Sequence, residues 1–390
     1  MGFDEITDRS GKRSTKWGMM GAYSKGPSEG AIPMWIADTD FRCPDFILDA
    51  ARDCIDHGIF GYSGDYSDYF DACKWWMKTR HSWEIESDWI IPMHGLGNAI
   101  ATALDTWADA GDRIVIFTPV YHEFSSKIQR LDQEVVECQL VEEHGKYTFD
   151  FDAYDQMMDG SEKILIFCSP HNPGGRVWSK EEIQGVCDFA RRHDLLLISD
   201  EIHQDIVYGG NKHIPTAVAD PSITDRLITV TAASKTFNIA GMRVGNTIIS
   251  DPKLRQEYFH RVEGLGLQPN TMGIPMSAAA YSPEGAAWTD ELVAYLNENR
   301  ALFDAALNAI PGVKSINLEG TFLAWVDFSG TGMDQTEIRK RLEGNDGVIA
   351  SQGLPFGSGG ETFMRFNIGT PRAILKQAIE RIQNAFSDLQ

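Results

Sequence analysis

Three apolar, strand-like segments of the chain are each followed by a side chain with distinct chemistry. Asn172 follows the segment KILIFCS, Asp200 follows LLLIS, and Lys235 stands a few residues beyond LITVT. Any one of them alone is equally well explained by a turn or a solvated surface group. Sheets with alternating strands and helices gather such strand ends at one edge, where ligands bind. An amine, a carboxylate and an amide at one edge therefore indicate a single reactive site.

These groups match the requirements of pyridoxal phosphate (PLP). A lysine amine can hold this cofactor as a Schiff base and, once a substrate has replaced it, can remove a proton from the substrate Cα. Lys235 is the candidate for both tasks. Asp200 is the carboxylate that would keep the pyridine nitrogen protonated, and Asn172 and His203 are the donors available to the ring oxygen. The sequence thus predicts a PLP site.

A short glycine-containing segment lies immediately before a predicted helix. Gly95, Leu96 and Gly97 precede a helical pattern over residues 99–108. The first N–H groups of a helix have no partners within it and attract anions. We therefore expect these three residues to bind the cofactor phosphate through their backbone amides.

Strand-like and helix-like segments alternate through most of the chain. Apolar runs rich in Ile, Leu and Val, without polar alternation, predict strands covered on both faces. Ser179 and Glu182 have the spacing of a capping box at the start of a helix. The alternation predicts an α/β protein built on a layered sheet. The predicted strands are 112–118, 163–169, 195–199, 227–231 and 246–249, and the predicted helices are 99–108 and 179–193.

The pattern changes after about residue 275. A helical segment over 286–309 is followed by short strands at 322–328 and 363–368 and by a helix over 371–389. The first residues, up to about position 40, are irregular, contain several glycines, and are expected to pack on this second unit. The sequence therefore predicts two domains: a large α/β domain, residues 45–280, and a smaller α+β domain, residues 1–44 and 281–390.

Composition limits the possible partners and locations. The chain has 390 residues, 43% of them hydrophobic, which is enough for a large buried core. Its formal net charge of −21 at pH 7 would repel nucleic acids and anionic membranes. Because it has neither a long apolar run nor a signal-peptide pattern, we expect a cytoplasmic location. The six cysteines lack CxxC spacing, and neither they nor the scattered histidines predict a disulfide framework or a metal site.

Four motifs carry a resemblance that covers nearly the whole chain. They are SPHNPGG at 169–175, SDEIH at 199–203, SKTFNIAGMR at 234–243 and RFNIG at 365–369. Together they resemble the fold-type I PLP enzymes, within the aminotransferase class I/II group. The resemblance implies an aspartate-aminotransferase-like fold. In that fold a large cofactor domain, with a mostly parallel seven-stranded sheet between helices, is joined to a smaller α+β domain.

The same resemblance implies roles for individual residues. Lys235 and Asp200 are catalytic, as their chemistry suggests, and Tyr121 joins them by stacking on the cofactor ring. Arg365 resembles the guanidinium that binds the substrate α-carboxylate, a task suited to its planar fork. The remaining residues implied are Ser234 and Arg243 for the cofactor, and Ala37 and Asn172 for the substrate.

Further segments resemble one branch of that group, the MalY- and PatB-like cystathionine β-lyases. They are MWIADTDF at 34–41, FGY at 60–62, WMKTRHSW at 76–83 and DEIH at 200–203. In this branch His203 occupies a position where ordinary aminotransferases often carry tyrosine. Tyr62 corresponds to a tyrosine that reaches the phosphate and substrate of the neighbouring subunit. The resemblance therefore implies a homodimer with shared active sites.

The branch implies a C–S β-lyase that converts cystathionine or a related S-substituted L-cysteine to a thiol, pyruvate and ammonia. An aminotransferase acting on an L-amino acid and a 2-keto acid is the alternative, because both reactions begin at Lys235. Arg243 matches the wider aminotransferase family, and the Gly95–Gly97 segment and Thr39 differ from many members of the branch. A third hypothesis is a regulatory protein that binds a transcription factor, a role that some proteins of this branch have.

Overall fold

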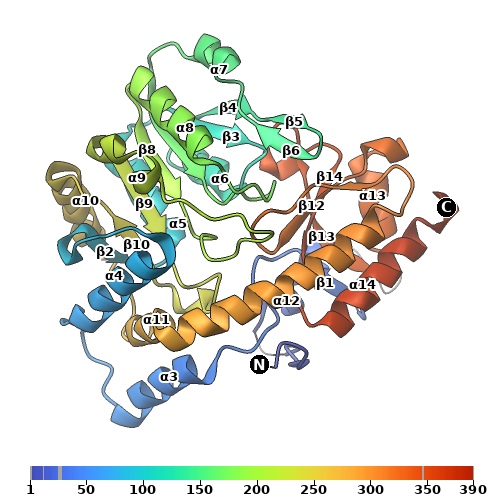
Figure 1. Cartoon of the computed structure of the whole chain (residues 1–390), viewed down its shortest axis with the longest axis horizontal. Coiled ribbons are helices and arrows are strands. Elements are labelled where there is room, and N and C mark those ends of the chain that lie inside the picture. The colour runs from blue at the N-terminus through green and yellow to red at the C-terminus, as the bar shows by residue number, and fades with distance from the viewer. Residues whose placement is uncertain (1, 12, 25–28, 345–346, 390) are drawn as a thin grey trace.

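Two sheets organise the chain, and helices pack around them (Figure 1). The computed structural model describes residues 2–11, 13–24, 29–344 and 347–389. The larger sheet has seven strands in the order β2-β10-β9-β8-β7-β3-β4. Its neighbours pair in parallel except that β10 is antiparallel to β2 and β9, which confirms the predicted mostly parallel sheet. The strands are β2 (Ile90–Met93), β3 (Arg113–Thr118), β4 (Glu134–Gln139), β7 (Glu162–Cys168), β8 (Leu196–Asp200), β9 (Leu227–Thr231) and β10 (Gly245–Ile248).

Alternate residues of the central strands face different helical layers. In β3, Ile114 and Ile116 join the apolar core beneath helices α5, α6 and α10, whereas Val115 and Phe117 join the core that contains α4 and α8. All four side chains are buried. Both faces of the sheet are therefore covered, as the unbroken apolar runs predicted. The helices are α4 (Ser67–His81), α5 (Leu96–Trp107), α6 (Glu123–Arg130), α8 (Lys180–Arg192) and α10 (Pro252–Leu265).

Two helix starts test the boundary predictions. Helix α8 begins with the predicted capping box: Ser179 Oγ accepts from Glu182 N at 3.2 Å, and Glu182 Oε2 accepts from Ser179 N at 2.7 Å. The predicted start of α5 was wrong. This helix begins at Leu96 rather than at residue 99, so Leu96 and Gly97 form part of its first turn. Glycine is tolerated there because the first N–H groups make no intrahelical hydrogen bond in any case.

The smaller sheet has five strands in the order β1-β13-β14-β12-β11. Strand β1 (Ile32–Met34) pairs in parallel with β13 (Val348–Gln352), so the first residues of the chain pack on this second unit as expected. The expected irregular structure there includes two short helices, α1 (Thr15–Gly18) and α2 (Met20–Ser24). The other strands are β11 (Lys314–Ser315), β12 (Leu323–Asp327) and β14 (Phe363–Asn367), and the helices that complete this unit are α12 (Pro283–Leu307), α13 (Gln335–Leu342) and α14 (Arg372–Ala385).

We propose that the two domains divide as the sequence suggests, into residues 45–280 and residues 1–44 with 281–390. The membership of the two sheets supports this division, because β1 lies in the small sheet and β2 begins the large one. Strands β5 (Val141–Glu143) and β6 (Lys146–Thr148) pair with each other as a separate two-stranded sheet. The remaining α-helices are α3 (Asp45–His57), α7 (Phe151–Met157), α9 (Thr216–Ala219) and α11 (Gly273–Ala280).

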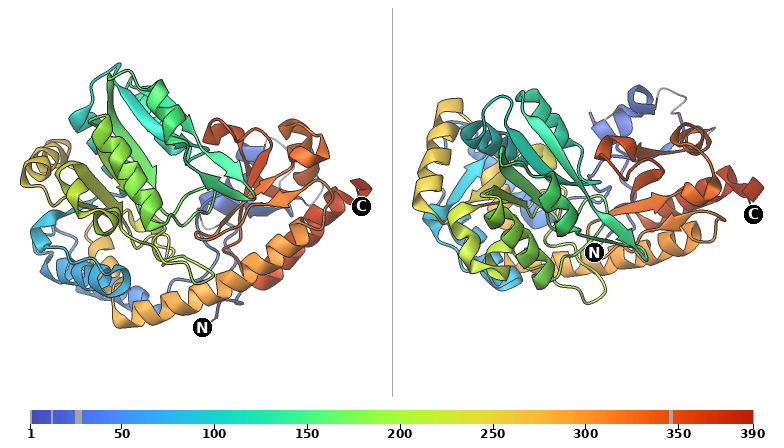
Figure 2. Two further views of the ribbon diagram at one scale, coloured as in Figure 1. Left: turned by 45° about the horizontal axis from the view of Figure 1, so that its top comes forward. Right: turned by 90° about the horizontal axis from the view of Figure 1, so that it is seen from above.

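Helix α12 runs along both units (Figures 1 and 2). Near its start Trp288 stacks on Phe237, with ring centroids 5.3 Å apart, and further along Phe303 packs on Phe366 of β14 at 5.4 Å. Although α12 has 25 residues, no helix among the described residues is long and apolar enough to cross a membrane. Contacts at both ends of one helix fix the two sheets relative to each other.

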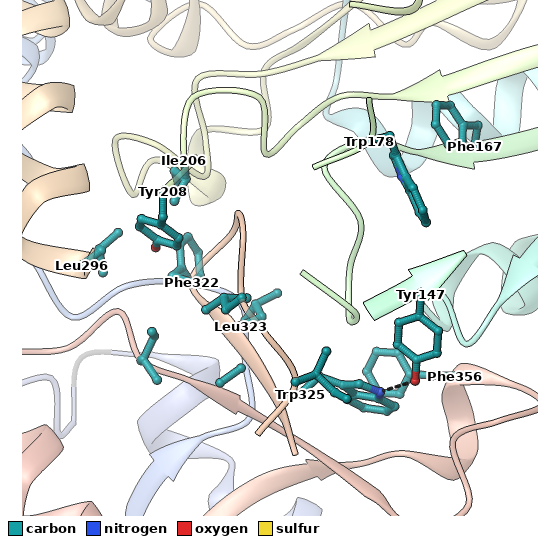
Figure 3. Close-up of a cluster of buried hydrophobic side chains, with 14 of the residues drawn as sticks. Tyr147, Phe167, Trp178, Ile206, Tyr208, Leu296, Phe322, Leu323, Trp325 and Phe356 are labelled. Carbon is teal, nitrogen blue, oxygen red and sulfur yellow. Dashed lines mark hydrogen bonds between the residues drawn. The ribbon is translucent and has the colours of Figure 1, made fainter. Parts of the chain in front are cut away.

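Aromatic side chains also fill the contact between the two units. Trp325 of β12 donates its Nε1 hydrogen to the hydroxyl oxygen of Tyr147 of β6 at 3.0 Å (Figure 3). Phe356 packs against Trp325 with centroids 5.2 Å apart. All three side chains belong to the same buried cluster, which takes residues from both sheets. The two units therefore share one core.

Candidate active site

The three strand-end residues singled out by the sequence lie around one cavity. Asn172, Asp200 and Lys235 line a cavity of about 220 Å³ at the carboxyl ends of β7, β8 and β9. Of the other predicted site residues, Arg365 lines a neighbouring cavity, and Tyr62 lines neither of the two. The rest line the first cavity: Ala37, Gly95, Leu96, Gly97, Tyr121, His203, Ser234 and Arg243.

Lys235 extends from the loop after β9 into the cavity. Its Nζ donates a hydrogen bond to the carbonyl oxygen of Ala37 at 2.7 Å. Burial lowers the pKa of the amine from 10.5 to about 8, although the charge of Asp38 opposes this change. A fraction of the amine is therefore uncharged near neutral pH, as a nucleophile or a base must be.

Asp200 is the last residue of β8, and its carboxyl group is buried. One oxygen, Oδ1, accepts the backbone N–H of Ile202 at 3.1 Å. Burial nevertheless raises the pKa of the carboxyl from 3.8 to about 7, only partly offset by this hydrogen bond and by the charge of Lys235. A buried carboxylate without an ion-pair partner is stabilised by a cation placed beside it.

The N-terminus of α5 supplies backbone donors at another wall of the cavity. Gly95 precedes the helix with φ of 80°, a left-handed conformation that glycine adopts without strain. A side chain at this position would also approach Arg243, since an added Cβ would lie 3.6 Å from Arg243 Cδ. The first turn of α5, beside Arg243 and Ser234, is suited to an anion.

Arg365 lies on β14 of the small sheet and is 3% exposed. Its Nη1 donates to Asn172 Oδ1 at 3.1 Å, and its Nη2 donates to the carbonyl oxygen of Trp35 at 2.9 Å. Burial lowers the pKa of the guanidinium to about 10, so it remains a cation at neutral pH. Its cavity, of about 930 Å³, shares Lys235 and Tyr121 with the first one. A buried cationic fork thus stands close to the amine.

The two tyrosines of the predicted site have different surroundings. Tyr121 lines both cavities, and burial raises its pKa to about 12, so its hydroxyl keeps its proton at neutral pH. Tyr62 is fully exposed. The structure therefore does not bring Tyr62 into the site of its own chain, and its expected role across a subunit interface stays a prediction.

The donor set fits PLP. His203 is buried, and its Nδ1 atom has no hydrogen-bond partner within the described part of the chain. Asp200 offers a buried carboxyl for a pyridinium, Lys235 an amine for an aldehyde, and the start of α5 a set of amides for a phosphate. Each polar group of PLP thus has a candidate partner of complementary chemistry.

The sequence interpretation missed how residues 35–41 are held across the site. Their carbonyl oxygens accept hydrogen bonds from side chains of both units: Asn238 Nδ2 donates to Thr39 O at 2.9 Å, and Asn367 Nδ2 donates to Ile36 O and Asp38 O at 2.6 Å each. Both asparagines lie inside motifs that were used only as family markers. The signal available in the sequence was the side-chain amide of an asparagine within each motif, because its two N–H donors can bind two backbone carbonyl oxygens at once.

Comparisons with known proteins agree with this geometry. The family model described as aminotransferase class I and II matches residues 40–382. Cystathionine β-lyase PatB of Bacillus subtilis is 36% identical over 99% of this chain and 100% of its own length. The structure of cystalysin from Treponema denticola, which contains pyridoxal 5′-phosphate, matches with a TM-score of 0.95, 34% identity and coverage of 100% of this chain and 99% of that one. The PLP-bound C–S lyase from Staphylococcus hominis matches with a TM-score of 0.90, 31% identity and coverage of 99% and 98%.

Proposed function

Because the chain belongs to the aminotransferase class I and II family, we propose that it is a PLP-dependent C–S β-lyase. The observation that carries the proposal is the meeting of Lys235, Asp200 and Arg365 around two adjoining cavities. The kinship with PatB over the full chain selects C–S cleavage among the reactions of the family. The proposed substrates are cystathionine and related S-substituted L-cysteines.

The residues of the first cavity would hold the cofactor. When bound, PLP supplies an aldehyde that condenses with amines and a pyridine ring that accepts electron density from the bonds to the substrate Cα. Lys235 is the amine for the aldehyde, and Asp200 is the partner of the pyridine nitrogen. The other proposed contacts are Asn172 and His203 to the ring oxygen, Tyr121 to the ring face, and Gly95, Leu96, Gly97, Ser234 and Arg243 to the phosphate.

The second cavity would hold the substrate. Arg365 binds the α-carboxylate through its guanidinium, and Asn172, already bonded to Arg365, and Ala37 limit the orientation of the Cα atom. Lys235 Nζ then removes the Cα proton, for which a pKa of about 8 is suitable. Cleavage of the Cβ–S bond releases a thiol, and water then cleaves the C–N bond of the remaining three-carbon fragment to give pyruvate and ammonia.

A substrate panel tests this function. Purified protein with PLP should release pyruvate and a thiol in equal amounts from cystathionine or S-alkyl cysteines, and the products are measured by lactate dehydrogenase coupling and a thiol reagent. Alanine, which has no leaving group on Cβ, is the matched control. If no compound of the panel yields a thiol, but alanine and a 2-keto acid exchange their amino group, the protein is an aminotransferase and the lyase proposal is wrong.

We also propose a homodimer in which Tyr62 completes the site of the neighbouring subunit. Tyr62, Ile59 and Phe60 form an apolar, exposed segment after α3, with exposed fractions of 108%, 69% and 59%. Contiguous exposed apolar side chains are typical of protein interfaces. One further copy of this chain is the proposed partner.

Mixing two inactive variants tests the shared site. Lys235→Ala and Tyr62→Ala should each impair catalysis, but a hybrid dimer would contain one site with both residues intact. We expect activity to return after subunit exchange, up to half that of the wild-type dimer, and sedimentation to give the mass of a dimer. A monomeric mass, or no recovery in a proven hybrid, contradicts this arrangement.

The proposed location of the reaction is the cytoplasm. All six cysteines are free, and four of them are buried. Burial raises the pKa of the thiols of Cys43, Cys73 and Cys138 to about 12, so they remain protonated and unreactive. Free thiols are usual in proteins of a reducing compartment.

A further inference from the structure

A buried carboxylate connects the two loops that carry the proposed catalytic groups. Asp205 lies in the loop that follows Asp200, and Thr236 directly follows Lys235. Thr236 Oγ1 donates to Asp205 Oδ2 at 2.7 Å. The side chain of Asp205 is 1% exposed, and Thr236 is completely buried. Neither residue lines the cavity that Lys235 and Asp200 line.

Helix α4 supplies the other donors to the same carboxylate. Trp76 Nε1 donates to Asp205 Oδ1 at 3.0 Å, and His81 Nε2 lies 2.9 Å from the same oxygen. Burial lowers the pKa of His81, which makes it a neutral imidazole that donates through Nε2. Burial disfavours the charged form of Asp205, yet the hydrogen bonds from His81 and Thr236 hold the pKa of its carboxyl below the usual range. The carboxylate is therefore ionised, and both of its oxygens have donors.

A second pair supports the first residues of the same loop. Glu201 is completely buried and accepts from Ser199 Oγ, Thr216 N and His213 Nε2, each at 2.9 Å. The rings of His213 and His81 lie 5.6 Å apart, so the two carboxylate networks touch. In the sequence Asp200 directly precedes Glu201, and His203 lies between Glu201 and Asp205. One buried carboxylate therefore anchors the chain on each side of His203.

We propose that Asp205 is a positioning residue that keeps the Lys235 loop in register with the Asp200–His203 segment through its hydrogen bond to Thr236. This inference rests on the proposed function, because it concerns the same lysine. Lys235 must serve first as the covalent holder of the cofactor and then as the base at Cα, so its side chain moves while its backbone has to stay in place. The bond from the adjacent residue to a fixed carboxylate supplies that support.

The variant Thr236→Val tests the proposal, because valine has nearly the shape of threonine and lacks the hydroxyl donor. Leaving a buried carboxylate oxygen without its donor should weaken PLP binding to the cofactor-free protein by about tenfold. The visible circular dichroism of the bound cofactor should also decrease, since it reports how the cofactor is oriented. We expect kcat to fall more than KM rises, and Thr236→Ser to restore all three properties.

Ser315→Ala is the matched control. Ser315 Oγ donates to the carboxylate of Asp304 at 2.6 Å, far along α12 from Lys235. Losing this hydroxyl should lower Tm without changing PLP affinity or the visible signal. If Thr236→Val behaves like Ser315→Ala, the hydrogen bond is only structural and the proposal is wrong.

Trp76→Phe provides a second route, since it removes one donor from Asp205 and keeps an aromatic side chain. Should Thr236→Val fail to fold, Trp76→Phe decides: weaker PLP binding supports the proposal, and PLP binding within about twofold of the wild type overturns it. Wild-type protein that takes up no PLP would contradict the proposed function itself. Tight binding by the wild type with no change in the variants contradicts only the role of Asp205.

Discussion

Replacing Lys235 by alanine should reduce release of pyruvate and thiol by at least about 10⁴-fold, because one side chain supplies both the covalent anchor and the base. The buried amine has a pKa of about 8, and within the described part of the chain no other side-chain amine donates to Ala37 O. The visible absorption band that lysine-linked PLP produces should disappear as well. Both changes are measured on the same preparation, by steady-state assay and by absorbance.

The control for this prediction is Lys253→Ala, at an exposed lysine of α10 that lines neither of the two cavities. This variant should keep the activity and the absorption band of the wild type. Lys235→Ala protein that retains more than about one hundredth of the wild-type rate, in folded form, would mean that another group removes the Cα proton.

Replacing Asp200 by asparagine should change activity and stability in opposite directions. If Asp200 pairs with the pyridine nitrogen, removing its charge leaves the buried positive charge of the cofactor without a partner, which costs about 3–5 kcal/mol. The rate should therefore fall by roughly 150-fold to 5,000-fold. Asparagine can still accept the N–H of Ile202, as Asp200 Oδ1 does, so the loop should keep its conformation.

The stability effect follows from the pKa of Asp200. Burial raises this pKa from 3.8 to about 7 in the folded chain, so the folded protein holds a proton between about pH 4 and pH 7 that the unfolded chain releases. The contribution of Asp200 to stability therefore decreases as pH rises through this window. Asparagine carries no charge at any of these pH values, so cofactor-free Asp200→Asn should be more stable than the wild type above pH 7 and equal to it near pH 4.

Thermal unfolding of cofactor-free protein at pH 4, 6 and 8 measures this difference, which should reach a few kcal/mol at pH 8. Asp304→Asn is the matched control, because burial also raises the pKa of Asp304, which lies on α12. That control should change stability but not activity. An Asp200→Asn protein less stable than the wild type at pH 8 would show that the carboxylate is already well paired.

The apolar strand ends were the part of the site that the sequence could predict. Asn172, Asp200 and Lys235 come together because buried strands are recognisable as apolar runs, and parallel strands end at one edge. Short strands such as β1 and β2 carry weak local patterns and were not assigned, and helices α3 and α4 were not assigned either. Their pairing and packing are decided by distant parts of the chain, to which a local pattern does not respond.

The contacts that could not be predicted from the sequence all have a backbone carbonyl oxygen as the acceptor. Asn238, Asn367 and Lys235 all bind backbone carbonyl oxygens of residues 35–41, and every residue except proline offers the same donor and acceptor. Nothing in the side-chain sequence of that segment therefore identifies its partners. The start of α5 was missed because glycine usually disfavours a helix. Gly97 lies in the first turn of α5, where its N–H needs no partner within the helix.

The pairing of β1 with β13 has a consequence for synthesis on the ribosome. Ile32 lies beside Val348 in the small sheet, with the whole large sheet encoded between them. Strand β1 must wait, without its strand partner, until β13 has been made. Domains generally fold in the order of their synthesis, so the large domain should form first. Strand β13, which is made after the large sheet, then pairs with β1 and brings residues 35–41 across the active site.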